Sequence, residues 1–319
     1  MADETDDLPR IAAAVAANPS IAAKSEISLI SEVLPPGNWF SGPGDDGAAL
    51  TLGGTTIITC GEAIYPPLVE RDPYGAGVAA VLANVNDVAA MGGEPLAIVD
   101  TIVAPREHAR RILEGMRWAA DLYRVPIVGG HYTPSTGAPS LSAFALGEAD
   151  AVLSLTHARP GQDLVVAVCD EGTMREDFPF FRSFDERGLQ LADDVRLLPR
   201  IAREGLAAAA KDISMAGLVG SLAMLLEWGG LGVEVDIRAV PAPAHVPLER
   251  WFNCFPCYGF LLTCEVAMTE ACVEVFTQAG LAAARVGTLD STGIIRLRDA
   301  DVVVDVLQVE RTTGILKSG

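Results

Sequence analysis

One segment constrains the fold of this chain more than any other. Residues 75–91 are almost entirely Ala, Val, Leu and Gly, apart from Asn84, Asn86 and Asp87. This composition predicts a helix, and a helix that is apolar on most of its faces must be buried. Asn84 and Asp87 are three residues apart and therefore share a face. Burying a carboxylate is costly unless it is paired or binds a metal. Either Asp87 meets a cation inside the protein, or it lies at a partly exposed helix end.

Strand-like and helix-like segments alternate around this helix. In the first half, the expected strands are 55–59, 96–103, 125–128 and 141–146, and an amphipathic helix is expected at 105–123. In the second half, the expected strands are 164–168, 233–237, 260–264 and 294–297, and the expected helices are 197–210, 216–228 and 269–279. The pattern predicts an α+β protein with a β-α-β-β-α-β-like mixed N-terminal domain, residues 1–155, and an α+β C-terminal domain, residues 156–319.

The charge of the chain excludes two classes of partner. It has 23 Lys and Arg against 42 Asp and Glu, a net charge of −19. Such a surface repels nucleic acid and anionic membranes, which bind through clustered cations. No apolar stretch of about 20 residues lacks a charge or a proline, and the acidic start is unlike a signal peptide. We therefore expect a cytoplasmic protein. The only lysines are Lys24, Lys211 and Lys317, so a bound anion needs arginine, backbone N–H groups or a metal ion.

Several carboxylates stand at positions that suit a hard cation. Asp45 and Asp46 lie in a glycine-rich turn that includes Gly44, directly before a run of small apolar residues. Two adjacent acids repel each other and favour a cation, although Asp-Gly pairs are also common in ordinary turns. Glu62 comes at the expected end of a strand. Mg²⁺ prefers a few carboxylates together with substrate phosphates.

Asp212 and Ser214 stand between two apolar helices. Ser and Asp are common helix N-caps, but a helix N-terminus also attracts phosphate, so the two roles are compatible. His131 follows the pair Gly129-Gly130 and is either an acid, base or ligand, or a structural histidine. The chain has no G-x-x-x-x-G-K-[ST] and no G-x-S-x-G. Its six cysteines are interpreted as buried free thiols. For the C-x-x-C of Cys254 and Cys257, the alternative is a redox pair or half of a zinc site, although no second pair of ligands completes such a site.

The order of these motifs resembles the AIR synthase-related superfamily, from about residue 25 to about residue 298. The motifs are Gly44-Asp45-Asp46-Gly47-Ala48-Ala49, Asn84-Val85-Asn86-Asp87-Val88-Ala89-Ala90-Met91-Gly92, Gly129-Gly130-His131 and Asp212-Ile213-Ser214. Members include aminoimidazole-ribonucleotide synthetase, thiamine-monophosphate kinase, selenophosphate synthetase and a hydrogenase-maturation protein. In amino-acid sequence, the motifs are most similar to those of thiamine-monophosphate kinase, and the resemblance indicates a divergent subgroup.

The resemblance implies two α+β domains, a homodimer built on the N-terminal sheets, and ATP held by several Mg²⁺ ions. By position, it implies metal ligands at Asp45, Asp46, Glu62, Asp87 and Asp212, and nucleotide contacts at Gly44, Asp45, Asn84, Gly129, Gly130 and Ser214. Asp87 and His131 are the residues expected to act in catalysis.

The chain also departs from the kinase pattern. Met215 replaces an acidic ligand, Leu155 stands where the kinase has a phosphate-contacting arginine, and residues 255–258 replace the motif that carries a substrate-contacting glutamate. His131 replaces an aspartate, although selenophosphate synthetases have the same GGH. These changes argue against thiamine monophosphate as the substrate.

The expected function is Mg²⁺- and ATP-dependent phosphoryl transfer to an unidentified small-molecule acceptor, with the aperiodic segment 169–195 as a candidate acceptor lid. Two alternatives stay open: a nucleotide-binding or regulatory protein without catalysis, and a genuine thiamine-monophosphate kinase.

Overall fold

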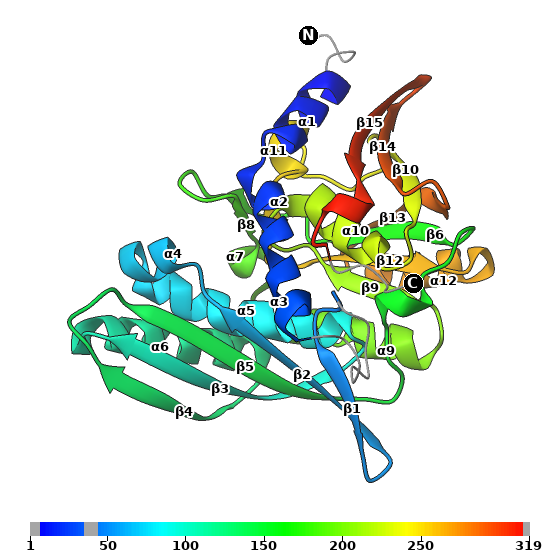
Figure 1. The fold of residues 1–319 in the computed structure, drawn as a ribbon. Helices are drawn as coiled ribbons and strands as arrows, with labels where there is room; N and C mark the ends of the chain where they lie inside the picture. The colour runs from blue at the N-terminus through cyan, green and yellow to red at the C-terminus, as the bar shows by residue number, and fades with distance from the viewer. Residues whose placement is uncertain (1–6, 35–43, 315–319) are drawn as a thin grey trace. The chain divides into compact units, whose positions relative to one another are not determined.

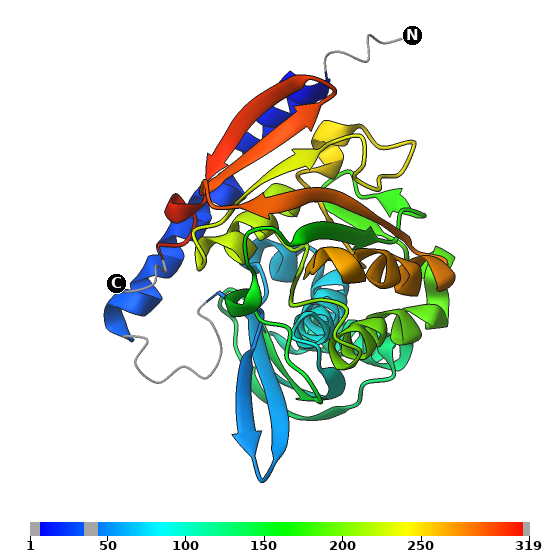
Figure 2. The same ribbon diagram turned by 90° about the vertical axis from the view of Figure 1, so that its right-hand side faces the viewer.

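The computed structural model describes residues 7–34 and 44–314, and Figures 1 and 2 show them in two views at right angles. They form two compact units. One contains residues 46–152 and 187–203, and the other contains the remaining described residues. We call them the five-stranded unit and the seven-stranded unit after their main sheets.

The five-stranded unit is built on one mixed sheet with the strand order β1-β2-β5-β3-β4. Its strands are β1 (Ala48–Leu52), β2 (Thr55–Ala63), β3 (Glu94–Ala104), β4 (Ile127–Pro134) and β5 (Ser140–Ala149). Its helices are α4 (Pro66–Arg71), α5 (Pro73–Ala90), α6 (Arg106–Tyr123), the 3₁₀ turn η4 (Gly188–Gln190), α8 (Leu191–Val195) and α9 (Leu197–Arg203). β3 and β4 are parallel and are connected through α6, whereas the other neighbours are antiparallel.

The two faces of this sheet differ. Along β3 and β5, buried and exposed residues alternate, as in a sheet with one covered face. Helix α5 lies on the covered face, where Asn84 Nδ2 donates to the Ala143 carbonyl at 3.3 Å. On the other face Val99, Phe144 and Leu146 are 38%, 43% and 47% exposed. The second face is therefore apolar and open to solvent.

Helices α5 and α6 meet backbone to backbone at two glycines. A Cβ atom added to Gly77 would lie 2.1 Å from the Ile112 carbonyl oxygen, and one added to Gly115 would lie 2.1 Å from the Tyr74 carbonyl oxygen. Both clashes are with backbone atoms, which a rotamer change does not relieve. The position of α5, and with it of Asp87, depends on this close crossing.

We expect Gly115→Ala to lower the free energy of unfolding by about 2–3 kcal/mol, because the new methyl group forces the two helices apart. Urea denaturation measures the loss. Gly137→Ala is the matched control, since a Cβ there meets only the Ser135 hydroxyl oxygen at 3.5 Å. Equal stability of the two variants would contradict the close crossing.

The seven-stranded unit has the sheet order β15-β14-β10-β13-β6-β12-β9. The strands are β6 (Asp163–Val168), β9 (Ala209–Asp212), β10 (Gly232–Asp236), β12 (Gly259–Cys264), β13 (Ala282–Asp290), β14 (Ile294–Asp299) and β15 (Val302–Gln308). The helices are α1 (Asp7–Ala16), α2 (Pro19–Ala23), α3 (Ser28–Val33), α7 (Phe184–Arg187), α10 (Gly217–Glu227), α11 (Leu248–Trp251) and α12 (Thr269–Gln278). Residue 187, the last of α7, falls in the five-stranded unit.

Shorter elements complete this unit. A small sheet has the order β11-β8-β7, with β7 at Thr173–Met174, β8 at Phe180–Arg182 and β11 at Phe255–Pro256. The 3₁₀ turns are η2 (Lys24–Ile27), η3 (Leu155–His157), η5 (Val266–Met268) and η6 (Val309–Arg311). Leu8, Ile11 and Val15 of α1 are at most 2% exposed and belong to the core of this unit.

The predicted α+β class with two domains is confirmed, but several local predictions differ from the structure. The predicted helix 197–210 is wrong in its second half, because α9 ends at Arg203 and residues 209–212 form β9. Ala-rich sequence favours a helix, yet pairing with β12 overrides that preference. Strands β1 and β15 were not predicted. Gly129 and Gly130 lie inside β4 rather than in a turn after it.

The two units also differ from the predicted domains 1–155 and 156–319. The first residues of the chain up to Asp45 belong with the seven-stranded unit, and residues 187–203 belong with the five-stranded unit. The predicted lid, residues 169–195, is therefore divided between the units and contains β7, β8 and α8. Residues 42 and 43 of the predicted glycine-rich turn lie outside the described residues. Among residues 7–34 and 44–314, each helix is too short or too polar to span a lipid bilayer.

Candidate metal and nucleotide site

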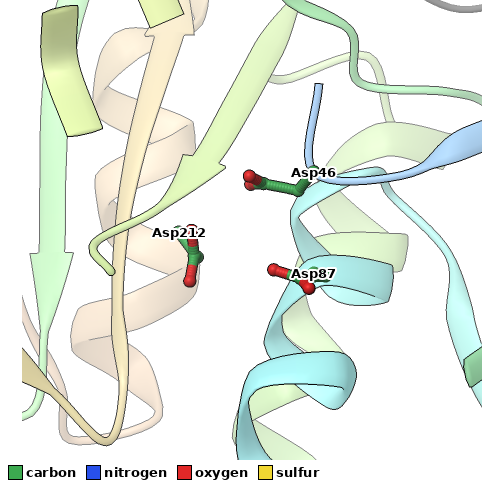
Figure 3. Close-up of side chains that lie close together, drawn as sticks. All are labelled: Asp46, Asp87 and Asp212. Carbon is green, nitrogen blue, oxygen red and sulfur yellow. The ribbon is translucent and has the colours of Figure 1, made fainter. Parts of the chain in front are cut away.

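Two predicted metal ligands come together within the five-stranded unit. Asp46 lies in the turn before β1, and Asp87 lies on α5 (Figure 3). One carboxylate oxygen of Asp46 and one of Asp87 are within 4.8 Å of each other. Asp87 is only 5% exposed. The structure thus places two acids that are far apart in sequence beside each other, one of them buried.

Helix α5 brings Asp87 inside because it is buried along most of its length. Its N-terminus is capped by Asp72, whose carboxylate accepts from the Gly75 N–H at 2.9 Å. Near its C-terminal end, Asn84 Nδ2 donates to the Ala80 and Ala143 carbonyls, and Asn84 Oδ1 accepts from the Cys60 thiol. Asn84, predicted to contact the nucleotide, therefore fastens α5 to the sheet, and a nucleotide contact at Asn84 remains a prediction.

The pKa of the Cys60 thiol is affected by burial and by the acids around it. Burial raises its pKa far above the ordinary value, and the negative charges of Asp87, Glu62 and Asp46 raise it further. All four side chains belong to the five-stranded unit. The effect of three carboxylates on one thiol shows that negative charge accumulates at this end of α5.

Glu62 shares a row across the sheet with a carboxyl group that sequence analysis missed. The register aligns Glu62 with Ala143, Ala143 with Asp100, and Asp100 with Gly130. Asp100 is 6% exposed, and burial raises the pKa of its carboxyl group. A Cβ atom on Gly130 would meet the Asp100 carboxylate at 2.5 Å. An acid at an inward position of the expected strand 96–103 was the signal that could have found it.

His131 lies on the opposite face of the same sheet. It pairs with Thr101, and Thr101 is exposed between the buried residues Asp100 and Ile102. Since neighbouring residues of a strand point to opposite faces, the register separates His131 from the face that carries Glu62 and Cys60. Within its own unit, the structure does not bring His131 to the carboxylates. Its catalytic role remains a prediction.

Asp45 is held within the seven-stranded unit. Its carboxylate accepts from the Ser154 hydroxyl at 2.6 Å and from the Leu155 N–H at 2.8 Å. Leu155, which stands where the kinase has an arginine, is thus part of a structural turn. Gly44 precedes Asp45 with a φ of +96°, a conformation that favours glycine. These contacts orient Asp45, and metal or nucleotide binding by Asp45 remains a prediction.

Asp212 and Ser214 also belong to the seven-stranded unit. They lie where β9 leads into α10. Asp212 is 5% exposed at the end of β9, and Lys211 beside it is 4% exposed. The Lys211 ammonium nitrogen lies 3.7 Å from Asp212 Oδ1. The Ser214 N–H donates to the Ser221 hydroxyl at 3.0 Å. Sequence analysis noted Lys211 only as one of three lysines, and its burial beside a predicted ligand is new.

Among the described residues, the group of possible metal ligands does not include Cys254 or Cys257. All six cysteines are free and buried, which confirms the prediction. Burial raises the pKa of Cys254 and of Cys257 to about 12. Both therefore remain thiols at neutral pH.

The donor set fits a divalent hard cation. Asp46 and Asp87 offer carboxylate oxygens within 4.8 Å of each other, which are the ligands that Mg²⁺ prefers. Nothing in the geometry of this unit conflicts with Mg²⁺ bound by a few carboxylates and completed by phosphate oxygens or water.

Two family models match the chain. The N-terminal domain of AIR synthase related proteins matches residues 44–149, and the C-terminal domain matches residues 183–300. The chain is 33% identical over 251 residues to the uncharacterized protein sll0787 of Synechocystis, covering 77% of each. It is 27% identical over 297 residues to the PurL subunit of phosphoribosylformylglycinamidine synthase of Methanopyrus kandleri, covering 82% of this chain and 40% of that protein. The chain thus spans well under half of that PurL.

Solved structures share the fold. PurL of T. maritima complexed with ADP matches with a TM-score of 0.77 and 19% identity over 94% of this chain and 53% of that chain. AaThiL complexed with AMPPCP and TMP matches with a TM-score of 0.67 and 18% identity over 88% of this chain and 96% of that chain. The similarity to PurL was not anticipated by the motif analysis. The two matched domains, which together cover most of the chain, show that this protein belongs to the AIR synthase-related family.

Proposed function

We propose that the protein is an Mg²⁺- and ATP-dependent phosphoryl-transfer enzyme that acts on a small-molecule acceptor. The observation that carries the proposal is the pair of carboxylates of Asp46 and Asp87, within 4.8 Å of each other, the second one buried. Phosphoryl transfer needs positioning and charge neutralisation more than covalent chemistry from the protein. The likeness of the fold to proteins solved with bound nucleotides supports the proposal.

The relatives support a nucleotide as the ligand. T. maritima PurL has been solved with ADP and with ATP, and AaThiL with AMPPCP. These complexes concern those proteins, which are less than 25% identical to this chain. We propose that the same class of ligand, a nucleoside triphosphate, binds here.

The proposed roles follow from the donor chemistry. We propose that Asp46, Glu62 and Asp87 hold Mg²⁺, which when bound neutralises the phosphate charge and orients the phosphoryl group. Asp212 is a further proposed ligand of Mg²⁺. Asp45 is a further proposed ligand. The backbone N–H groups of Gly44, Gly129 and Gly130, together with Ser214, are proposed phosphate or nucleotide contacts.

Titration calorimetry with ATP and Mg²⁺, run beside an assay of ADP release, tests the proposal. We expect binding together with acceptor-stimulated ADP release. The absence of the acidic residue at Met215 favours a second candidate, a nucleotide-binding protein without catalysis. Binding without turnover on any acceptor would support that candidate. Turnover with thiamine monophosphate would identify a thiamine-monophosphate kinase, and absence of binding would refute all three.

We also propose that the protein is a homodimer through the open face of the five-stranded sheet. Val99, Phe144 and Leu146 form an apolar surface there, and such surfaces mark interfaces. The Phe144 ring lies over Gly61, since a Cβ on that glycine would meet ring atoms at 2.4 Å. The ring thus covers Gly61 of its own sheet, and we propose that its exposed side contacts a second copy.

Phe144→Asp is expected to convert the dimer to a monomer, because the interface would then bury an unpaired charge. Light scattering after size-exclusion chromatography measures the mass. Val266→Asp, at a residue 65% exposed in the seven-stranded unit, is the control and should leave the mass unchanged. A monomeric wild type, or a dimeric Phe144→Asp variant, would contradict the proposed interface.

A further inference from the structure

Lys211 is a buried cation next to a proposed metal ligand. It is one of three lysines in the chain and is only 4% exposed, at the end of β9. Its ammonium nitrogen lies 3.7 Å from Asp212 Oδ1, and Asp212 is itself 5% exposed. The separation is that of an ion pair rather than of a hydrogen bond. A lysine is rarely buried to this extent unless its charge is compensated.

The location of this ion pair suits a role in ligand binding better than a role in stability. Removing an ammonium and a carboxylate from water carries a large desolvation cost, and a pair of apolar residues is often as stable. β9 is the edge strand of its sheet, and Asp212 is its last residue. A buried lysine therefore brings a fixed positive charge to the point where we propose that a divalent cation and phosphate oxygens meet.

The positive charge of Lys211 has opposite effects on the binding of a divalent cation and on the binding of a phosphate. A fixed ammonium beside Asp212 repels a divalent cation that approaches the same carboxylate, and it competes with that cation for the carboxylate oxygens. The same ammonium attracts a phosphate. Before nucleotide arrives, Lys211 therefore weakens metal binding. Once phosphate is present, the ammonium has a second anionic partner, and Asp212 is available to the metal.

We propose that Lys211 is the internal counter-ion of Asp212 in the metal-free protein and becomes a phosphate contact when metal and nucleotide bind together. The inference rests on the proposed function, because it takes Asp212 as a ligand of Mg²⁺. It assigns Lys211 a role in coupling the two ligands: the metal binds weakly alone and tightly with nucleotide. No bond is formed or broken by Lys211 in this exchange.

The test measures Mn²⁺ binding by electron paramagnetic resonance and the binding of a non-hydrolysable ATP analogue by calorimetry at saturating Mn²⁺. Lys211→Met keeps an unbranched apolar side chain, one atom shorter than that of lysine, and removes its charge. We expect this variant to bind Mn²⁺ alone about tenfold more tightly than the wild type and the ATP analogue about tenfold more weakly. Structural damage would weaken both, so the opposite signs identify the counter-ion role.

Two further variants sharpen the experiment. Lys211→Arg keeps the charge and should retain wild-type binding of both ligands within about threefold. Lys24→Met removes one of the other lysines, on η2 of the same unit, and should change neither affinity. Circular dichroism checks that each variant is folded, because removing one partner of a buried ion pair is destabilising.

The outcomes separate this inference from the proposed function. If the wild type binds neither Mn²⁺ nor the ATP analogue, the proposed function fails. If the wild type binds both, but Lys211→Met leaves the affinity for Mn²⁺ alone unchanged or lowers it, only the counter-ion role is overturned.

Discussion

The Asp87→Asn variant is expected to release ADP from ATP at least about 10³-fold more slowly than the wild type while remaining folded. Asp87 is buried on α5 with its carboxylate near that of Asp46. The amide that replaces it has the same shape but no negative charge. Charge that is organised in advance inside a water-poor site is the largest single contribution to many enzymatic rate enhancements. Loss of this proposed ligand should therefore remove most of the turnover.

The control separates chemistry from folding. Asp121→Asn removes an exposed carboxylate on α6 of the same unit and should leave the rate unchanged. Thermal unfolding without metal should give both variants a transition close to that of the wild type, because the Asp87→Asn exchange conserves volume and removes a buried charge. Wild-type turnover in Asp87→Asn would refute the proposed role of this carboxylate. A variant that has lost its unfolding transition would instead assign Asp87 to the stability of the fold.

The Asp163→Asn variant is expected to lower the free energy of unfolding of the seven-stranded unit by about 2–3 kcal/mol near pH 7. Asp163 is 3% exposed at the start of β6. Its carboxylate accepts from the hydroxyls of Thr269 and Thr288 at 2.9 Å each and lies 2.7 Å from Arg285 Nε. An amide cannot accept at all of these positions, so α12, β13 and β6 lose a shared contact.

This carboxylate also gives the unit a dependence on pH. Burial raises the pKa of Asp163, but hydrogen bonds from Arg285, Thr269 and Thr288 and the charge of Arg285 outweigh it, and the net pKa is lowered. A group whose pKa is lower in the folded state stabilises the fold above its ordinary pKa of about 4, and this contribution is lost as the pH falls through the folded-state pKa.

Urea denaturation of the wild type and of Asp163→Asn at several pH values measures both effects. The difference between the two proteins should be full near pH 7 and should shrink well below pH 4. Asp301→Asn, which changes an exposed acid in the same unit, is the control and should track the wild type. A difference that stays constant down to acidic pH would show that the charge of Asp163 contributes nothing.

The sequence predicted the structural features that follow from an unusual local composition. The apolar segment 75–91 predicted a buried helix, and α5 is buried along most of its length. Asp87 stood out because an acid inside such a helix needs a reason to be there. The acids next to Gly44 stood out for the same kind of reason, since two adjacent charges in a tight turn repel each other. Such features are local, and local propensity and periodicity describe them well.

Pairing between distant strands was not predictable in the same way. Residues 209–212 have the sequence of a helix end, but they pair with β12 as β9. The segment 187–203 lies in sequence between two stretches of the seven-stranded unit, yet it packs with the five-stranded unit. Loop-like and helix-like segments of this kind are placed by the surfaces they bury, which depend on residues far away along the chain.

The sequence alone determined the family, the α+β class and the identity of most candidate ligands, because these follow from motifs and from the burial that composition demands. Only the tertiary structure decided which of those residues share a face. It placed Asp46 beside Asp87, put His131 on the opposite face from Glu62 through the strand register, and buried Lys211 against Asp212. The physical reason is that the side of a sheet on which a residue lies, and the charge it meets there, are set by long-range pairing, since a shift of one residue in register reverses every side chain.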